Sequence, residues 1–239
     1  MLRTVASLNG HAIRATDDEL GHVKEIYFDD EQWGVRYLIV ETGSWLAKRP
    51  VLLSPYSIKE IDDASETIEV SLTREQIKNA PDVDTQKPVS RHSESEYSRY
   101  YGYGQYWSGP YMWGIGAYPM PVSTVAGGLS PAAEQRNEAL DHAPSDTSED
   151  VHLHSSDEVS GYDIHGTDEA IGHVKGFIFD DKEWAIRYLV VDTHNWWPGG
   201  KKVLIATRWI ESIDWMDSIV QTKLTRDQIK NSPEYDEDM

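Results

Sequence analysis

Residues 21–30 read Gly-His-Val-Lys-Glu-Ile-Tyr-Phe-Asp-Asp, and residues 172–181 read Gly-His-Val-Lys-Gly-Phe-Ile-Phe-Asp-Asp. The match resumes further along as Leu-Thr-Arg-Glu-Gln-Ile-Lys-Asn at 72–79 and Leu-Thr-Arg-Asp-Gln-Ile-Lys-Asn at 224–231. The offset between the copies is constant before residue 45 and one residue longer after residue 51. A match of this length indicates an internal duplication, and each copy is long enough to form a small domain with its own core.

The composition restricts the classes of function that the chain can have. The 239 residues carry a formal net charge of −19, which opposes direct binding to nucleic acid or to anionic lipid by like-charge repulsion. Cysteine is absent, so disulfides, thiol nucleophiles and thiolate metal sites are excluded. The apolar runs are too short for a signal peptide or an integral membrane segment, and we expect a cytoplasmic protein.

Within each copy, apolar residues alternate or form short runs between turn signals, a pattern typical of β-strands. Residues 33–40 and 184–191 predict the most apolar strands, and we expect Trp33, Trp184, Tyr37 and Tyr188 to supply much of the two cores. Tight turns with a glycine at positive φ are expected at 18–21 and 168–172.

A short helix is expected at the end of each copy. Thr73 and Thr225 are suitable N-caps, and Gln76 and Gln228 stand three residues later, as a capping box requires. About six short strands in so few residues favour a curled sheet, because a flat one would leave exposed edges and an uncovered face. We therefore predict a mainly β protein with two small β-barrels, each with a short C-terminal helix.

The second copy carries a set of motifs at 161–168, 171–175, 184–193, 196–204 and 224–233, and the first copy matches them more loosely. In these motifs the chain resembles the bacterial PRC-barrel domain, a family named after the cytoplasmic domain of the photosynthetic reaction centre H subunit and also found in a ribosome maturation factor. The resemblance implies a barrel used for protein contacts, without a shared catalytic residue set. The chain lacks the membrane helix of the H subunit and the partner domain of the maturation factor, so neither specific function carries over.

The predicted organisation is a first PRC-type barrel at 1–84, a long low-complexity connector at 85–150 and a second barrel at 151–239. Residues 86–96 and 145–150 are polar or acidic and are expected to be solvated linker. A short helix is expected near 131–140, with Pro131 at its first position.

The middle of the connector is rich in tyrosine, tryptophan and glycine. Such a tract either folds back over a barrel or stays disordered, or it binds a partner or a second copy of itself. We consider aromatic residues of the tract and of two barrel loops as candidate interaction residues: Tyr101, Tyr103, Tyr106, Trp107, Tyr111, Trp113, Trp45, Trp196 and Trp197. Trp209 is a further candidate for exposure, although burial in a core is the competing explanation for the barrel tryptophans.

Few residues suggest chemistry. The acid pairs at 29–30 and 180–181 are expected to be turn formers, because they lack calcium-loop spacing. Arg36 and Arg187 are expected to face outward or to pair with a carboxylate such as Glu41 or Asp192.

A metal site is the other chemical alternative. His142, His152 and His154, with nearby acids, form the nearest approach to a metal cluster, but without a recognised ligand spacing. We therefore predict no metal and no cofactor.

The sequence thus favours a non-enzymatic protein-interaction or assembly module with protein partners. A homodimer and pairing of the two barrels within the chain are both open. One alternative is a soluble accessory protein that docks on a membrane electron-transfer complex. A metal-dependent enzyme built on His142, His152 and His154 is the remaining alternative.

Overall fold

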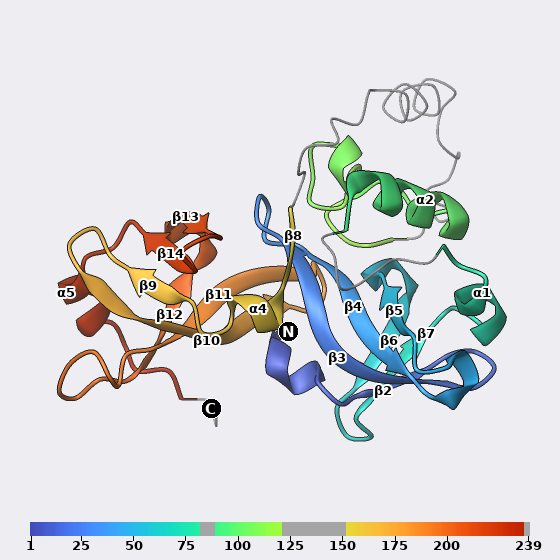
Figure 1. Ribbon diagram of the computed structural model, residues 1–239, viewed down its shortest axis with the longest axis horizontal. Helices are drawn as coiled ribbons and strands as arrows, with labels where there is room; N and C mark the ends of the chain where they lie inside the picture. Colours follow the sequence, from blue (N-terminus) through green and yellow to red (C-terminus); the bar gives the residue numbers. More distant parts are fainter. Residues whose placement is uncertain (82–88, 121–151, 237–239) are drawn as a thin grey trace. The chain divides into compact units, whose positions relative to one another are not determined.

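The computed structural model describes residues 1–81, 89–120 and 152–236 (Figure 1). The helix expected near 131–140, the acidic stretch at 145–150 and His142 lie outside the described residues. The chain divides into two compact units, and each is described by itself. The repeat-1 unit contains Leu8–His154 together with Lys182–Trp184, and the repeat-2 unit contains Met1–Ser7, Ser155–Asp181 and Ala185–Met239.

The repeat-1 unit is built on one sheet of seven strands, in the order β5-β4-β3-β2-β7-β6, with β8 paired to β3. Neighbouring strands are antiparallel except β2 and β7, which are parallel, among the pairs that have a described register. The strands are β2 (Ala12–Arg14), β3 (Glu19–Asp29), β4 (Val35–Thr42), β5 (Pro50–Leu53), β6 (Ile58–Asp62), β7 (Thr67–Val70) and β8 (Leu153–Ser155). The helices are α1 (Arg74–Lys78), α2 (Arg91–Tyr101) and the 3-10 turns η1 (Val5–Leu8, shared with the other unit), η2 (Ser44–Leu46), η3 (Pro55–Ser57) and η4 (Tyr106–Ser108).

The repeat-2 unit has the same sheet, in the order β12-β11-β10-β9-β14-β13, with β1 paired to β10. Figure 1 shows β3 and β10 as the long curved strands of their units. The strands are β1 (Leu2–Thr4), β9 (Asp163–His165), β10 (Ala170–Asp180), β11 (Ala185–Asp192), β12 (Lys202–Ala206), β13 (Ile210–Asp214) and β14 (Ile219–Thr222). The helices are α4 (Ser156–Val159), α5 (Arg226–Lys230) and the 3-10 turn η6 (Thr207–Trp209). The predicted mainly β fold in two copies is thus confirmed.

The two terminal helices begin as predicted. The Thr73 side chain accepts the N–H of Gln76, and the Gln76 side chain accepts the N–H of Thr73; Thr225 and Gln228 make the same reciprocal bonds. An N-cap of this kind contributes about 1 kcal/mol, a large share of the stability of a helix of one turn and a half.

The turn between β3 and β4 is organised by Asp29. Its carboxylate accepts the N–H groups of Gln32 at 2.7 Å and Gly34 at 3.1 Å, so this acid is a turn former as predicted. Trp33 lies between them with a φ of 60°, the left-handed conformation that a tight reversal demands.

Two expectations need correction. Gly21 has a φ of 152°, but it lies inside β3 rather than in a turn. A Cβ there would meet the Glu41 carbonyl oxygen at 1.9 Å, so glycine is needed for the close approach of two strands. Trp184 is buried, yet it belongs to the repeat-1 unit, where its carbonyl accepts the N–H of Val35 at 2.7 Å. Asp181, the counterpart of Asp30, binds Arg3 through its carboxylate.

The described part of the connector is not solvated linker. Residues 91–101 form the helix α2, which is capped by the Ser90 side chain and ends at Gly102 in the left-handed conformation. Glu94, Tyr97 and Ser98 are buried along one side of it. The connector residues at 89–120 therefore complete the repeat-1 unit, whereas the sequence alone assigned them to neither barrel.

Candidate interaction surfaces

A buried carboxylate joins the connector to the sheet of the repeat-1 unit. The Glu94 side chain is fully enclosed. One of its oxygens accepts the hydroxyls of Tyr37 on β4 at 3.0 Å and of Tyr106 at 2.9 Å. The other lies 2.7 Å from Nε2 of His152, in the segment before β8. Because hydrogen bonds to a charged group are about twice as strong as neutral ones, this acid links three segments that lie far apart in the sequence.

The chemistry of this cluster keeps its phenols neutral. Burial raises the pKa of Tyr37 well above its ordinary value, and the negative charge of Glu94 raises it further. Burial and then Glu94 act in the same sense on the pKa of Tyr106. Both hydroxyls therefore stay protonated as donors, and the cluster serves to hold the segments together.

Arg36 is enclosed by the same segments and does not face outward; it pairs with a carboxylate, the other of the two expected arrangements, and that carboxylate is Asp29 rather than Glu41. Its Nε donates to Asp29 at 2.7 Å, and Nη1 donates to the carbonyl of Met112 at 2.6 Å. The guanidinium lies 3.7 Å from the centre of the Tyr106 ring and 4.9 Å from that of Trp113. Asp29 is the partner because the turn between β3 and β4 places its carboxylate beside Arg36, and connector residues cover the guanidinium.

Aromatic rings continue this cover along the sheet. Tyr56 stacks on Tyr103 and meets Trp113 edge to face, each with ring centres 5.1 Å apart. The Tyr97 hydroxyl donates to the carbonyl of Leu52 at 3.0 Å and accepts the N–H of Ser54 at 3.1 Å. Pairs of this kind add about 0.5–1.5 kcal/mol each beyond the area that they bury. The described connector residues, 89–120, are therefore a bound part of the unit.

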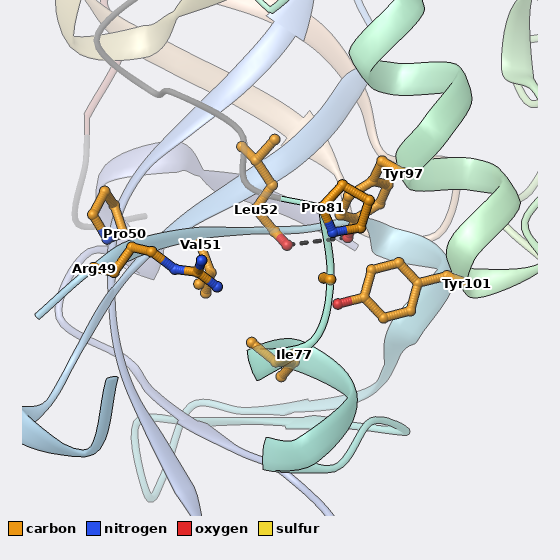
Figure 2. A pocket seen from close by; sticks show the side chains of 9 residues that line it. Arg49, Pro50, Val51, Leu52, Ile77, Pro81, Tyr97 and Tyr101 are labelled. Atoms are coloured by element: carbon orange, nitrogen blue, oxygen red, sulfur yellow. Dashed lines mark hydrogen bonds between the residues drawn. The ribbon is translucent and has the colours of Figure 1, made fainter. Parts of the chain in front are cut away.

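A small pocket remains beneath this cover. Figure 2 shows Tyr97 and Tyr101 of α2 facing Leu52 of β5, with Ile77 of α1 on the opposite side. The cavity volume is about 20 Å³, which is room for about one water molecule. The pocket is too small to hold a substrate or a cofactor.

The candidate interaction residues have different environments. Tyr106, Trp113 and Trp197 are buried at 6, 3 and 7% exposure. The half-buried ones are Tyr101, Tyr103, Trp107, Trp45 and Trp196. Only Tyr111 among the nine is exposed, at 56%.

The loop tryptophans pack against their own units. Trp45 donates its indole N–H to the carbonyl of Leu20 at 2.7 Å. The Arg226 guanidinium lies 5.3 Å from the centre of the Trp197 ring, so the expectation that Trp197 is exposed was wrong. Trp209, by contrast, is 40% exposed, as expected.

Sequence reasoning missed two residues of this cluster, Glu94 and Arg91. The Nη1 of Arg91 donates to the Tyr106 hydroxyl at 2.7 Å. A signal for them existed: Glu94, Tyr97 and Tyr101 follow one another at helical spacing after the N-cap Ser90. The serine-rich composition of the segment concealed it.

The two described histidines of the metal alternative contact different acids. His152 pairs with Glu94, and Nε2 of His154 lies 3.3 Å from an Asp30 oxygen. Over residues 1–81, 89–120 and 152–236, no group of three or more histidines and acids is arranged to hold a metal ion. The third histidine of this alternative, His142, lies outside those ranges.

The repeat-2 unit presents the equivalent face without such a cover among the described residues. Tyr188 and Leu204 are half-buried, whereas their counterparts Tyr37 and Leu52 are 3 and 5% exposed. Three further pairs show the same contrast: Trp209 is 40% exposed against 1% for Ser57, Leu2 is 52% exposed against 5% for Leu153, and Arg208 is exposed where Tyr56 is buried. Ile178 and Val190, the counterparts of Tyr27 and Ile39, are buried in the repeat-2 unit as well. We call Leu2, Tyr188, Leu204, Arg208 and Trp209 the open face.

The model of one known protein family matches both copies. It describes the PRC-barrel domain and matches residues 3–77 and 153–229. No curated protein matches the chain. In the described part of the chain, no helix is both long enough and apolar enough to span a bilayer.

Proposed function

The chain belongs to the PRC-barrel domain family, whose domain it carries twice, and from that premise we propose that it is a non-enzymatic protein-interaction module. The two domains are consistent with a role in binding or assembly. The proposal assigns no catalytic step to any residue. It places the binding of a protein partner on the open face of the repeat-2 unit.

A single observation carries this proposal. Among the described residues, the same face of the same fold is covered by an aromatic segment in one unit and is open in the other. In the repeat-1 unit, Tyr97 and Val89 of the connector pack with Tyr37, Ile39 and Leu52 of the sheet. The connector thus provides an example, within the molecule, of what this face binds.

The covering segment also indicates the chemistry of the partner. Tyr37 donates its hydroxyl to a carboxylate, and Tyr188 repeats that phenol on the open face. Trp209 and Leu204 supply apolar area, and Arg208 supplies a positive charge beside them. Aromatic residues and arginine are enriched where partners bind most tightly. We therefore propose a partner segment that brings aromatic rings and at least one carboxylate.

The test uses a synthetic peptide of residues 89–120 as a probe, added to the intact protein and followed by calorimetry. We expect the peptide to bind the wild type, and we expect Trp209→Ser or Tyr188→Phe to weaken that binding. Serine is the residue that repeat 1 has in place of Trp209, so the fold accepts it. Met216→Ala is the matched control, because Met216 is 95% exposed on another hairpin of the unit and repeat 1 has Ala64 there.

Two outcomes would contradict the proposal. Absence of peptide binding to the wild type would remove the argument that the open face takes a connector-like segment. Equal loss of binding in Met216→Ala and Trp209→Ser would show that the effect does not belong to the open face.

A further inference from the structure

Two short strands at equivalent positions are exchanged between the two sequence repeats. β1 at Leu2–Thr4 and β8 at Leu153–Ser155 begin the two repeats at the same offset as the duplicated segments. Yet β1 pairs with β10, a strand of repeat 2, and β8 pairs with β3, a strand of repeat 1. Each sheet is thus completed by the first strand of the other repeat.

The bonds that hold the two strands repeat one another. The N–H of Asp181 donates to the carbonyl of Met1 at 3.0 Å, and the N–H of Asp30 donates to the carbonyl of His152 at 3.3 Å. Asp30 and Asp181 are equivalent residues, as are Met1 and His152. Both sheets therefore receive the incoming strand at the same point and in the same way.

The side chains at the two sites repeat as well. The Asp181 carboxylate accepts Nε of Arg3 at 2.7 Å, and an Asp30 oxygen lies 3.3 Å from Nε2 of His154. Arg3 and His154 are the middle residues of β1 and β8. Each site thus combines a sheet edge, an acid at its end and a short strand with a basic residue at its centre.

From this repetition we infer that the edges of β3 and β10 are binding sites for the first strands of a second copy of the chain, and that the protein forms strand-exchanged dimers. A short strand held by backbone bonds and by pairing with one acid at the sheet edge makes the same contacts whichever copy supplies it. The choice between the two sources depends on effective concentration, so exchange between copies rises with protein concentration during folding. In such a dimer, exchange of β8 would bring the second copy's adjoining His152 to the Glu94 cluster.

This inference is independent of the proposed function. Binding on the open face needs no exchange between copies, and exchange needs no peptide bound to that face. The two proposals can therefore fail separately.

The register of β1 on β10 gives a direct test. Leu2 lies opposite Asp180 in this antiparallel pair. Cα atoms of directly opposed residues are about 4.5–5.5 Å apart, within the range of a disulfide. The natural chain has no cysteine, so Leu2→Cys and Asp180→Cys introduce the only thiols.

The two single variants are unfolded together in denaturant, refolded at a series of concentrations and oxidised under identical conditions. A disulfide between positions 2 and 180 then joins two different copies. We expect this mixed disulfide, identified by mass spectrometry after proteolysis, to increase with protein concentration. Each variant refolded alone controls for random coupling between identical cysteines.

A chain that carries both substitutions provides the second measurement. In dilute solution it should close the disulfide within one copy, which verifies the register and the fold. If that chain closes its disulfide while the mixed single variants form none above their controls at any concentration, the exchange between copies is disproved. Failure of the double variant to close its disulfide would overturn the pairing on which the inference rests.

Discussion

The repeat-1 and repeat-2 units use one fold for two kinds of surface. At equivalent positions, Tyr37 donates to a buried carboxylate while Tyr188 is half-buried, and Ser57 is enclosed while Trp209 is 40% exposed. The strands, their order and the capped terminal helices are the same in both. The difference lies in the connector residues 89–120, which belong to the repeat-1 unit only. The segment attached to a duplicated domain can therefore change which surface that domain exposes, while the strand order stays the same.

Alkaline pH should produce the largest difference in stability between the two units. Burial raises the pKa of Tyr56 and of Tyr103 to about 12, and burial also raises the pKa of Tyr37, Tyr97 and Tyr106. An exposed phenol ionises near pH 10. Because the folded pKa is the higher one, the neutral phenols contribute full stability below about pH 10, and this contribution is lost as the pH rises toward 12.

We therefore expect the repeat-1 unit to unfold in alkali, and its buried tyrosines to ionise together with unfolding. A spectrophotometric titration of phenolate absorbance, combined with circular dichroism, measures both events. Ionisation of every tyrosine near pH 10 without loss of structure would contradict the prediction.

Replacement of Arg36 should have the next largest effect. Arg36→Ala leaves Asp29 buried without its charged partner and removes a ring contact on each side, so the free energy of unfolding should fall by about 3–5 kcal/mol. The matched change Arg187→Ala lies in a half-buried site and should cost about 1 kcal/mol or less. Urea unfolding of the two variants makes the comparison, and equal losses would show that the cover does not distinguish the two arginines.

A smaller and sharper change is removal of one hydroxyl. Tyr37→Phe removes a donor to Glu94 inside the repeat-1 unit and should lower the free energy of unfolding by about 1–3 kcal/mol. Tyr188→Phe should change stability by less than about 0.5 kcal/mol, while it weakens binding of the 89–120 peptide. The pair therefore separates a stabilising phenol from a binding one. A larger stability loss at Tyr188 would reverse their assignment.

The smallest effect concerns the docking of β1 in acid. Burial alone would raise the pKa of Asp181, but its hydrogen bonds to the terminal ammonium and Arg3, and their positive charges, outweigh burial and hold the pKa below its usual value. A depressed folded pKa contributes stability above the unfolded value near 4, and that contribution is lost as the pH falls through the folded pKa.

Asp181→Asn should remove this dependence and cost about 1 kcal/mol or less, because the ion pair is partly exposed. Hydrogen exchange of the β1 amides, measured across acidic pH, detects the change. If β1 is protected equally in the variant and the wild type at every pH, the ion pair does not hold the strand.

Local residue patterns were sufficient for much of the fold. Thr73 with Gln76, and Thr225 with Gln228, begin their helices as expected, because a capping box depends on residues three positions apart. The apolar runs at 33–40 and 184–191 became strands β4 and β11 for a similar reason, since alternation and β-branching act within a few residues. Asp29 organised its turn through amides at most five residues away.

The cover on the repeat-1 sheet and the exchange of β1 and β8 depend on contacts between residues that are distant in the sequence. Nothing near Arg36 in the sequence reveals that Met112 and Trp113 will enclose it, and nothing near Glu94 reveals the phenol of Tyr37. Composition indicated that the aromatic tract would bury its rings against some surface. It did not indicate whether that surface belongs to a barrel of the same chain or to a partner. Burial of Tyr106 and Trp113 resolves the question for those two residues, whereas Tyr111 stays exposed.

By itself, then, the sequence determined two copies of one β fold, their terminal helices and the acidic, cysteine-free character of the chain, because these follow from local periodicity and composition. Only the tertiary structure decided which copy the connector covers, and it alone placed β1 on β10 and β8 on β3. The physical reason is that the two sheet edges hold their strands through equivalent backbone bonds, at Asp30 and at Asp181, so the local bonds do not specify which strand goes to which edge. Their choice depends on chain closure and long-range packing, which no local pattern encodes.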